Sequence, residues 1–418
     1  MEELVPVPTA VAAPPPRPWT VFSSGPFRKL WVGTSLSLFG DFFSYIAIAW
    51  LVLQLTGSSL ALGSVLVAQA VPRGVLMLVG GALADRISPR VTMLASMGLR
   101  ALCVAPLAVL VLAGRVQMWE VYAISIVFGV VDAFFMPARQ SILPKTVADH
   151  ELDPGNAVLN VTMQASIILG PVLGGLVVAA FGTGWAFAAD AVCFAVGFLF
   201  ILWLPSAARA ATRAKHPDGG LGGQIVAGFR YAWADIGIRV LLIVIAVVDF
   251  AANGALGVGL PTLAHGRFDA GATGLGILFA AWGVGATAGA LSAGFVPAPK
   301  RFGWMTVALC VWLGIGVAVV GVVPSLAPAS VAMGLSGIAT GVINTYGISW
   351  LQRRTDPSMQ GRVMSLVMLA SMGLTPVAYA ASGAIADVNV TLLFLVSGGM
   401  MLACGLGAAA SRSVRSLR

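Results

Sequence analysis

The chain has 418 residues, of which 58% are hydrophobic and only 10% are charged, and its mean hydropathy is +0.94. Soluble domains carry roughly 25% charged residues, so this composition indicates that most of the chain lies in lipid. The formal net charge is +8, but the Lys and Arg residues stand at the ends of apolar runs rather than in one basic patch, which excludes a nucleic-acid-binding protein. The four cysteines fall inside apolar runs and the three histidines are scattered, so we predict no disulfides and no metal site.

Apolar runs long enough to span a bilayer, about 20 residues each, recur along the chain. The first 27 residues are rich in proline and lack the apolar core of a signal peptide, so we predict a disordered cytoplasmic tail. The rest predicts an all-α integral membrane protein with twelve transmembrane helices, near residues 29–54, 59–84, 91–113, 118–138, 155–181, 184–204, 239–263, 272–296, 302–322, 326–350, 361–386 and 390–410.

One polar segment interrupts this series of helices. It carries charged residues, Gly and Pro, and then the amphipathic stretch from Phe229 to Trp233, so we predict a linker with a surface helix. Gly170-Pro171 in the fifth helix and Thr375-Pro376 in the eleventh stand at similar depths, which favours two pseudo-symmetric six-helix halves. The predicted organisation is a tail at 1–27, an N-terminal half at 28–204, a cytoplasmic linker at 205–238, a C-terminal half at 239–410 and a cytoplasmic tail at 411–418.

The distribution of Lys and Arg predicts the orientation in the membrane. About twenty of these residues fall on one side of the predicted helices, whereas the opposite side holds only Arg115 and Arg267. Cytoplasmic loops carry an excess of Lys and Arg, so both termini are predicted to be cytoplasmic. The remaining two, Arg73 and Arg100, fall inside helices.

A short charged hinge separates the second and third predicted helices. Small residues there let helix ends approach closely, and the stretch Gly81-x-Leu83-Ala84-Asp85-Arg86-x-x-x-Arg90 resembles the loop between helices 2 and 3 of the major facilitator superfamily. The family usually has Gly and Arg where this chain has Ser88 and Pro89. The resemblance implies the fold of this superfamily, a monomer, and gating residues at Gly81, Asp85, Arg86 and Arg90.

The fifth helix contains the stretch from Gly170 to Gly175. Its proline removes a backbone donor and kinks the helix, and the glycines allow close packing. The stretch is similar to the GPxxGG motif of facilitator-superfamily antiporters, which marks exporters and is thought to seal the outer side against helix 8; the other interpretation is an ordinary kinked helix. The motif residues are Gly170, Pro171, Gly174 and Gly175, and the eighth helix offers Gly276, Gly283, Gly285 and Gly289.

Further stretches extend the resemblance over nearly the whole chain after residue 28. They are Pro137 to Pro144, Gly155-Asn156-Ala157 and Gly361 to Ser365. Together with the fifth helix they resemble the branch of the superfamily that holds enterobactin exporters and macrolide or multidrug efflux pumps. This resemblance implies export but not the substrate, because the branch exports chemically diverse molecules.

Several charged residues fall inside the predicted helices. A charge at the bilayer centre costs about 2.5–3.5 kcal/mol on insertion scales, so these side chains must pair or face water. Asp41 and Arg100 lie at similar depth, and we predict that Asp41 carries the transported proton with Arg100 as its counter-charge; a purely structural ion pair is the alternative. Arg73 is a further cation that can neutralise one of the acids.

The other three acids receive different predictions. Asp132 is expected near the cytoplasmic end of its helix, paired with Arg139 or with the hinge. Asp190 is expected near the outer end of the sixth helix, in contact with water. Asp249 is a further proton-coupling candidate, since Asn253 follows it one turn later on the same helix face and both can line a cavity.

A substrate cavity combines apolar walls with a few polar groups. With few fixed charges available, it suits a bulky amphipathic molecule that is neutral or weakly cationic. Each candidate lining residue can also be an ordinary packing residue. The candidates are Phe42, Tyr45, Gln69, Gln164, Asn253, Trp282, Asn344 and Tyr346.

No enzyme signature is present: the chain has no phosphate-binding GxxxxGK[ST] motif, so ATP hydrolysis is not expected. We predict a secondary transporter in the inner (cytoplasmic) membrane that exports a small antibiotic, siderophore or other metabolite in exchange for protons, with no cofactor. Its partners are the substrate, protons and the lipid bilayer. The alternatives are an importer or lysophospholipid transporter of the same fold, or a non-transporting membrane scaffold or sensor.

Overall fold

The computed structural model describes residues 18–84, 88–205, 221–268, 270–296, 301–411 and 415. Over these residues the secondary structure is entirely helical, and twelve segments are long and apolar enough to cross a membrane. Helices satisfy every backbone hydrogen bond within one segment, which a lipid environment demands. The predicted all-α fold with twelve spans is therefore confirmed.

The first six spans are single helices, and all but the fourth lie close to their predicted ranges. They are α1 (Gly25–Thr56), α2 (Ser59–Ala84), α3 (Pro89–Leu112), α4 (Met118–Thr146), α5 (Leu152–Phe181) and α6 (Thr183–Leu202). Helix α4 extends well past its predicted end at 138 and includes Pro137 and Pro144. This places Arg139 inside a helix rather than in a loop.

The C-terminal spans include two interrupted ones. The seventh consists of α8 (Ile236–Gly254), the π-helical turn η3 (Ala255–Gly259) and α9 (Leu260–Gly266), and the eleventh consists of α13 (Gln360–Met372) and α14 (Thr375–Val388). The other spans are α10 (Gly271–Phe295), α11 (Phe302–Val322), α12 (Leu326–Arg354) and α15 (Val390–Ala410). The amphipathic stretch of the linker lies in α7 (Leu221–Ala234), where Phe229 and Trp233 are exposed and stack on each other.

Residues 18–27, which were predicted to belong to a disordered tail, are ordered. A 3₁₀ helix, η1 (Pro18–Ser23), precedes α1, and Val21 and Phe27 are fully buried. The ring of Phe22 makes edge contacts with Phe27 and Trp31, at 5.5 and 5.1 Å between centroids. Burial of these side chains stabilises the segment from residue 18 onward.

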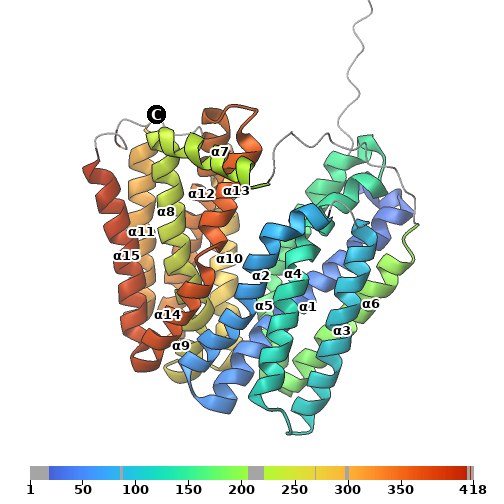
Figure 1. The fold of residues 1–418 in the computed structure, drawn as a ribbon. Helices are drawn as coiled ribbons and strands as arrows, with labels where there is room; N and C mark the ends of the chain where they lie inside the picture. Colours follow the sequence, from blue (N-terminus) through green and yellow to red (C-terminus); the bar gives the residue numbers. More distant parts are fainter. Residues whose placement is uncertain are drawn as a thin grey trace, which may run out of the picture.

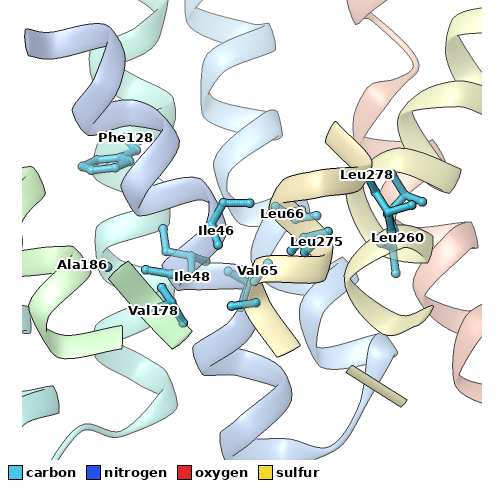
Figure 2. Close-up of a cluster of buried hydrophobic side chains, with 14 of the residues drawn as sticks. Ile46, Ile48, Val65, Leu66, Phe128, Val178, Ala186, Leu260, Leu275 and Leu278 are labelled. Carbon is cyan, nitrogen blue, oxygen red and sulfur yellow. The ribbon is translucent and has the colours of Figure 1, made fainter. Parts of the chain in front are cut away.

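The helices form two bundles, α1–α6 and α8–α15 (Figure 1). The bundles diverge toward the end that carries α7, which we call the α7 end, and converge at the opposite end, which we call the sealed end. There α9 and α14 lie beside the start of α2. Aliphatic side chains from both bundles form one buried cluster, including Ile46, Val65 and Leu66 on one side and Leu260, Leu275 and Leu278 on the other (Figure 2).

Glycines bring the two bundles together at the sealed end. A Cβ atom added to Gly63 of α2 would lie 2.9 Å from Cα of Gly383 in α14, and one added to Gly175 of α5 would lie 2.5 Å from the carbonyl oxygen of Ala272 in α10. A Cβ on Gly276 of α10 would meet the Pro171 carbonyl. Only glycine permits helix axes to approach this closely.

The antiporter motif divides its contacts between two helices. Gly175 faces α10 as predicted for a seal, whereas Gly170 and Gly174 lie against Phe42 and Phe43 of α1 in the same bundle. The glycines of α10 also contact two different helices. Gly276 and Gly283 face α5, but Gly285 and Gly289 lie against the backbone of α12.

A polar latch adds to this seal. The Asp387 carboxylate, at the end of α14, accepts hydrogen bonds from the Ser58 hydroxyl at 2.8 Å and from the Leu60 backbone N–H at 3.2 Å. It therefore caps the N-terminus of α2 from the other bundle, where a negative charge is favourable. Ser59 and Thr262 also hydrogen-bond across the bundles, at 3.0 Å.

Candidate functional site

A buried guanidinium organises the interior of the first bundle. Arg100 of α3 is 1% exposed; it donates one hydrogen bond to Asp41 of α1 at 2.8 Å and another to Asp132 of α4. Two carboxylates on different helices therefore share one cation. We call Asp41, Arg100 and Asp132 the charge triad. The expected pairing of Asp41 with Arg100 is present.

Aromatic rings surround this guanidinium. The rings of Phe128, Phe135 and Phe194 lie 5.1–5.3 Å from its central carbon. An Arg over an aromatic face is stabilised by the quadrupole of the ring. The rings also keep water away from Arg100, so the two carboxylates, rather than water, stabilise its positive charge.

The partner predicted for Asp132 was wrong. Asp132 pairs with Arg100 and lies 4.0 Å from Arg73 of α2, whereas Arg139 contacts the sulfur of Met163 instead. The reason is the length of α4. Because this helix runs on to Thr146, Asp132 lies at its middle rather than near its cytoplasmic end.

The prediction for Asp190 was also wrong. This residue is fully buried rather than in contact with water, since α6 packs closely against α1 at Gly40. Its carboxylate accepts a hydrogen bond from the Ser44 hydroxyl of α1, and its other oxygen has no partner among the described residues. The Asp41 and Arg100 charges act on it electrostatically. The first bundle thus holds a third acid beside the charge triad, and this one is fully buried.

A cavity of about 340 Å³ lies between the two bundles. Helices α1 and α2 form one wall, and α8, α13 and α14 form the other. Its lining residues are Tyr45, Leu66, Gln69, Ala70, Arg73, Gly74, Met77, Asp249, Asn253, Ser371, Met372, Thr375 and Tyr379. The volume falls in the range of small-molecule sites, and apolar and polar groups are mixed in its lining.

The predicted lining residues divide into two groups. Tyr45, Gln69 and Asn253 line this cavity, and so does Asp249. Four others lie elsewhere: Phe42 packs on Gly170, Gln164 donates to Thr287 at 3.3 Å between α5 and α10, Trp282 packs in the apolar core, and Asn344 is exposed on α12. Tyr346 donates to the Val296 carbonyl at 2.8 Å and also lies outside the cavity lining.

Comparison with known proteins decides the family. The family described as "Transmembrane secretion effector" (MFS_3) matches residues 16–416. The chain belongs to this major facilitator family. It is 29% identical over 361 residues to the multidrug efflux pump Tap of Mycolicibacterium fortuitum, covering 83% of this chain and 86% of Tap. It is 24% identical over 335 residues to the enterobactin exporter EntS of Escherichia coli O1:K1 / APEC, covering 77% and 79%.

Solved structures of similar fold include other facilitator-type transporters. The nucleoside transporter NupG has a TM-score of 0.74 at 13% identity, covering 92% of this chain and 98% of that one. A peptide transporter of the POT family has a TM-score of 0.73 at 13% identity, covering 94% and 98%. At these identities the likeness concerns the fold alone. The suspected superfamily and efflux branch are confirmed by the family and by Tap and EntS.

The facilitator hinge motif is only partly within the described residues. Gly81 lies in the last turns of α2, whereas Asp85 and Arg86 lie outside the described residues. Arg90 donates to the carbonyl of Leu202 at 2.6 Å and to that of Ile201 at 3.3 Å, at the C-terminus of α6. A cation there satisfies unpaired carbonyls and the helix dipole. Arg90 therefore fixes α3 to α6 within the first bundle.

Several cavity residues of this transporter were missed by the sequence interpretation. Ser371, Met372 and Thr375 flank the break between α13 and α14, where the eleventh span is interrupted. Tyr379 follows one turn later. The available signal was Gly373 together with Pro376, since Gly weakens a helix and Pro favours the first turn of a new one.

Proposed function

We propose that this facilitator-family transporter exports a small amphipathic molecule in exchange for protons. Two of its relatives are an efflux pump and an exporter. The observation that carries the proton-coupling part is that Asp41 and Asp132 share Arg100, while Asp41 is 36% exposed and Arg100 is 1% exposed. Asp41 is thus the most exposed member of the charge triad, since Asp132 is 19% exposed, and it is the member proposed to take up the proton.

The triad can accept a proton at a low energetic cost. When Asp41 binds a proton, Arg100 still pairs with Asp132, so no charge is left buried and unpaired. Removing one partner of a simple buried pair costs about 3–5 kcal/mol, and sharing the cation avoids this. Protonation weakens the link between α1 and α3, which gives the proton a means to alter helix packing.

The cavity between the bundles is proposed to hold the substrate, and rocking of one bundle against the other moves it, as expected for this fold. Arg353 and Arg354 end α12 at the α7 end. The positive-inside rule favours a cytoplasmic location for this end. The described conformation would then be closed toward the outside.

Efflux by cells that carry the wild type or Asp41→Asn tests this proposal, with and without a protonophore. Asp153→Asn, which changes an exposed acid at the start of α5, is the matched control. We expect the wild type and the control to lower accumulation of at least one compound, and the protonophore or Asp41→Asn to abolish this. Normal export by Asp41→Asn at equal membrane expression would refute the role of Asp41. Increased accumulation would instead indicate an importer.

A further inference from the structure

Two opposite charges face the cavity from different bundles. Arg73 of α2 lies on one wall, with its side chain 31% exposed, and Asp249 of α8 lies on the other. They do not pair with each other, since no salt bridge within 4.0 Å joins them. The cavity therefore presents a cation and an anion that do not neutralise one another directly.

The guanidinium of Arg73 has unused donors. Its nearest carboxylate is Asp132 at 4.0 Å, which exceeds hydrogen-bond distance. Over the described part of the chain it has no hydrogen-bonded acceptor. A guanidinium carries five N–H donors in a fork that matches a carboxylate or a similar planar acid. Arg73 is thus available to a group that enters the cavity.

The carboxylate of Asp249 also lacks a counter-ion. The Ser371 side chain lines the same cavity, and no Lys, Arg or His among the described residues lies within 4.0 Å of the Asp249 carboxylate. Asn253, one helical turn away on the same wall, adds an amide group and itself donates to Thr375 at 3.4 Å. An ammonium group placed here would gain a charged partner.

We infer that the transported molecule is zwitterionic, with an acidic group bound by Arg73 and a basic amine bound by Asp249. This inference rests on the transport function proposed above. One molecule with both charges satisfies both walls and links the two bundles, whereas a singly charged molecule leaves one of the two cavity charges without a partner on the ligand. The apolar remainder of the cavity, including Leu66 and Met372, contacts the body of the ligand.

Three probes with the same ring system test this inference in purified protein held in nanodiscs. They are 2-naphthylalanine, which is a zwitterion, 2-naphthylalaninamide, which is a cation, and N-acetyl-2-naphthylalanine, which is an anion. We expect the zwitterion to bind at least tenfold more tightly than either of the others. Equal binding of all three, or no binding of any, would overturn the inference without requiring a variant.

Two variants assign each charge to its wall. Arg73→Gln should abolish the advantage of the zwitterion over the cation, and Asp249→Asn its advantage over the anion. Arg115→Gln, at an exposed position outside the cavity, should leave the preferences unchanged. Equal weakening of all three probes by both variants would contradict the assignment, and thermal unfolding of each variant shows whether it is folded.

The two proposals fail separately. Suppose the wild type exports singly charged compounds in a proton-dependent manner, and the three probes bind equally. Proton-coupled export then stands, and the zwitterion inference falls. If the zwitterion binds as expected but Asp41→Asn still exports it against a gradient, the charged cavity stands and the proposed role of Asp41 falls.

Discussion

Substitution of Gly175 by alanine should shift the transporter away from the described conformation. The added Cβ atom would lie 2.5 Å from the Ala272 carbonyl oxygen and 3.2 Å from Cα of Thr273, whereas ordinary contact begins at 3.4 Å. These are backbone atoms, which cannot rotate away as a side chain does. Helices α5 and α10 must therefore separate by roughly 1 Å, and this separation breaks the close packing at their contact.

The size of the effect follows from this overlap. Overpacking of one methyl group costs about 1–3 kcal/mol. Since α5 and α10 belong to different bundles, opening of the sealed end relieves the strain without unfolding either bundle. An energy difference of this size changes a conformational equilibrium by roughly 5- to 150-fold. We expect a large increase in the population that is open at this end.

Pulsed electron paramagnetic resonance measures this population directly. Spin labels replace Phe181 and Leu392, which are 68% and 46% exposed at the sealed ends of α5 and α15, after the four native cysteines have been substituted. Gly175→Ala should transfer intensity to longer distances. Gly399→Ala is the matched control, because no atom lies within 4 Å of an added Cβ there. An unchanged distance distribution in Gly175→Ala would refute the reasoning.

Three further predictions concern polar groups. Arg100→Gln should lower the free energy of unfolding of the purified protein by about 3–5 kcal/mol, because it leaves two acids without their shared cation. Adding Asp132→Asn should recover part of this loss. An Arg100→Gln variant as stable as the wild type would contradict the charge triad. Although partial burial raises the pKa of Asp235, hydrogen bonds from Arg354 and from two backbone N–H groups hold that pKa below its usual 3.8. This stabilisation is complete above pH 3.8 and is lost as the pH falls further. Thermal unfolding midpoints measured at decreasing pH should therefore decline more in the wild type than in Asp235→Asn. Parallel declines in the two proteins would refute this. Asp387→Ala removes the cap of α2 at a cost of about 1 kcal/mol, so the same spin-label pair should report more opening of the sealed end; identical distances would show that the latch does not hold it.

The fold could be predicted almost entirely, since helix length and apolar composition are local properties of the chain. Discrepancies arose where local signals conflict. The fourth helix was predicted to end at residue 138, whereas α4 continues through Pro144, because proline within a membrane helix is tolerated when neighbouring groups satisfy the freed backbone. Because the predicted helix was too short, Asp132 was placed near its end instead of at its middle, and the wrong partner was predicted.

The site was only partly predictable, because pairing across helices depends on rotation about each helix axis. Asp41 and Arg100 could be matched by depth alone. Neither sequence position nor depth shows that Asp190 faces Gly40 in a tight helix contact, which removes it from water. The cavity residues beside the α13–α14 break were missed for a similar reason, since interruption of the helix turns Ser371 and Thr375 toward the other bundle.

The two bundles differ in the kind of chemistry that they contain. The charge triad lies wholly in α1, α3 and α4, whereas both interrupted spans belong to the second bundle and carry Asp249, Ser371 and Thr375 to the cavity. In the functions proposed above, proton handling is thus confined to the first half of the chain, whereas substrate recognition draws on both halves, since Tyr45, Gln69 and Arg73 also line the cavity. In a chimera that joins residues up to the linker of this transporter to the C-terminal half of a relative, we expect the energy source to follow the first half and the preference for the amine bound by Asp249 to follow the second. On these proposals, exchange of one gene segment alters one wall of the cavity, and with it part of the substrate range, while the proposed coupling residues stay unchanged.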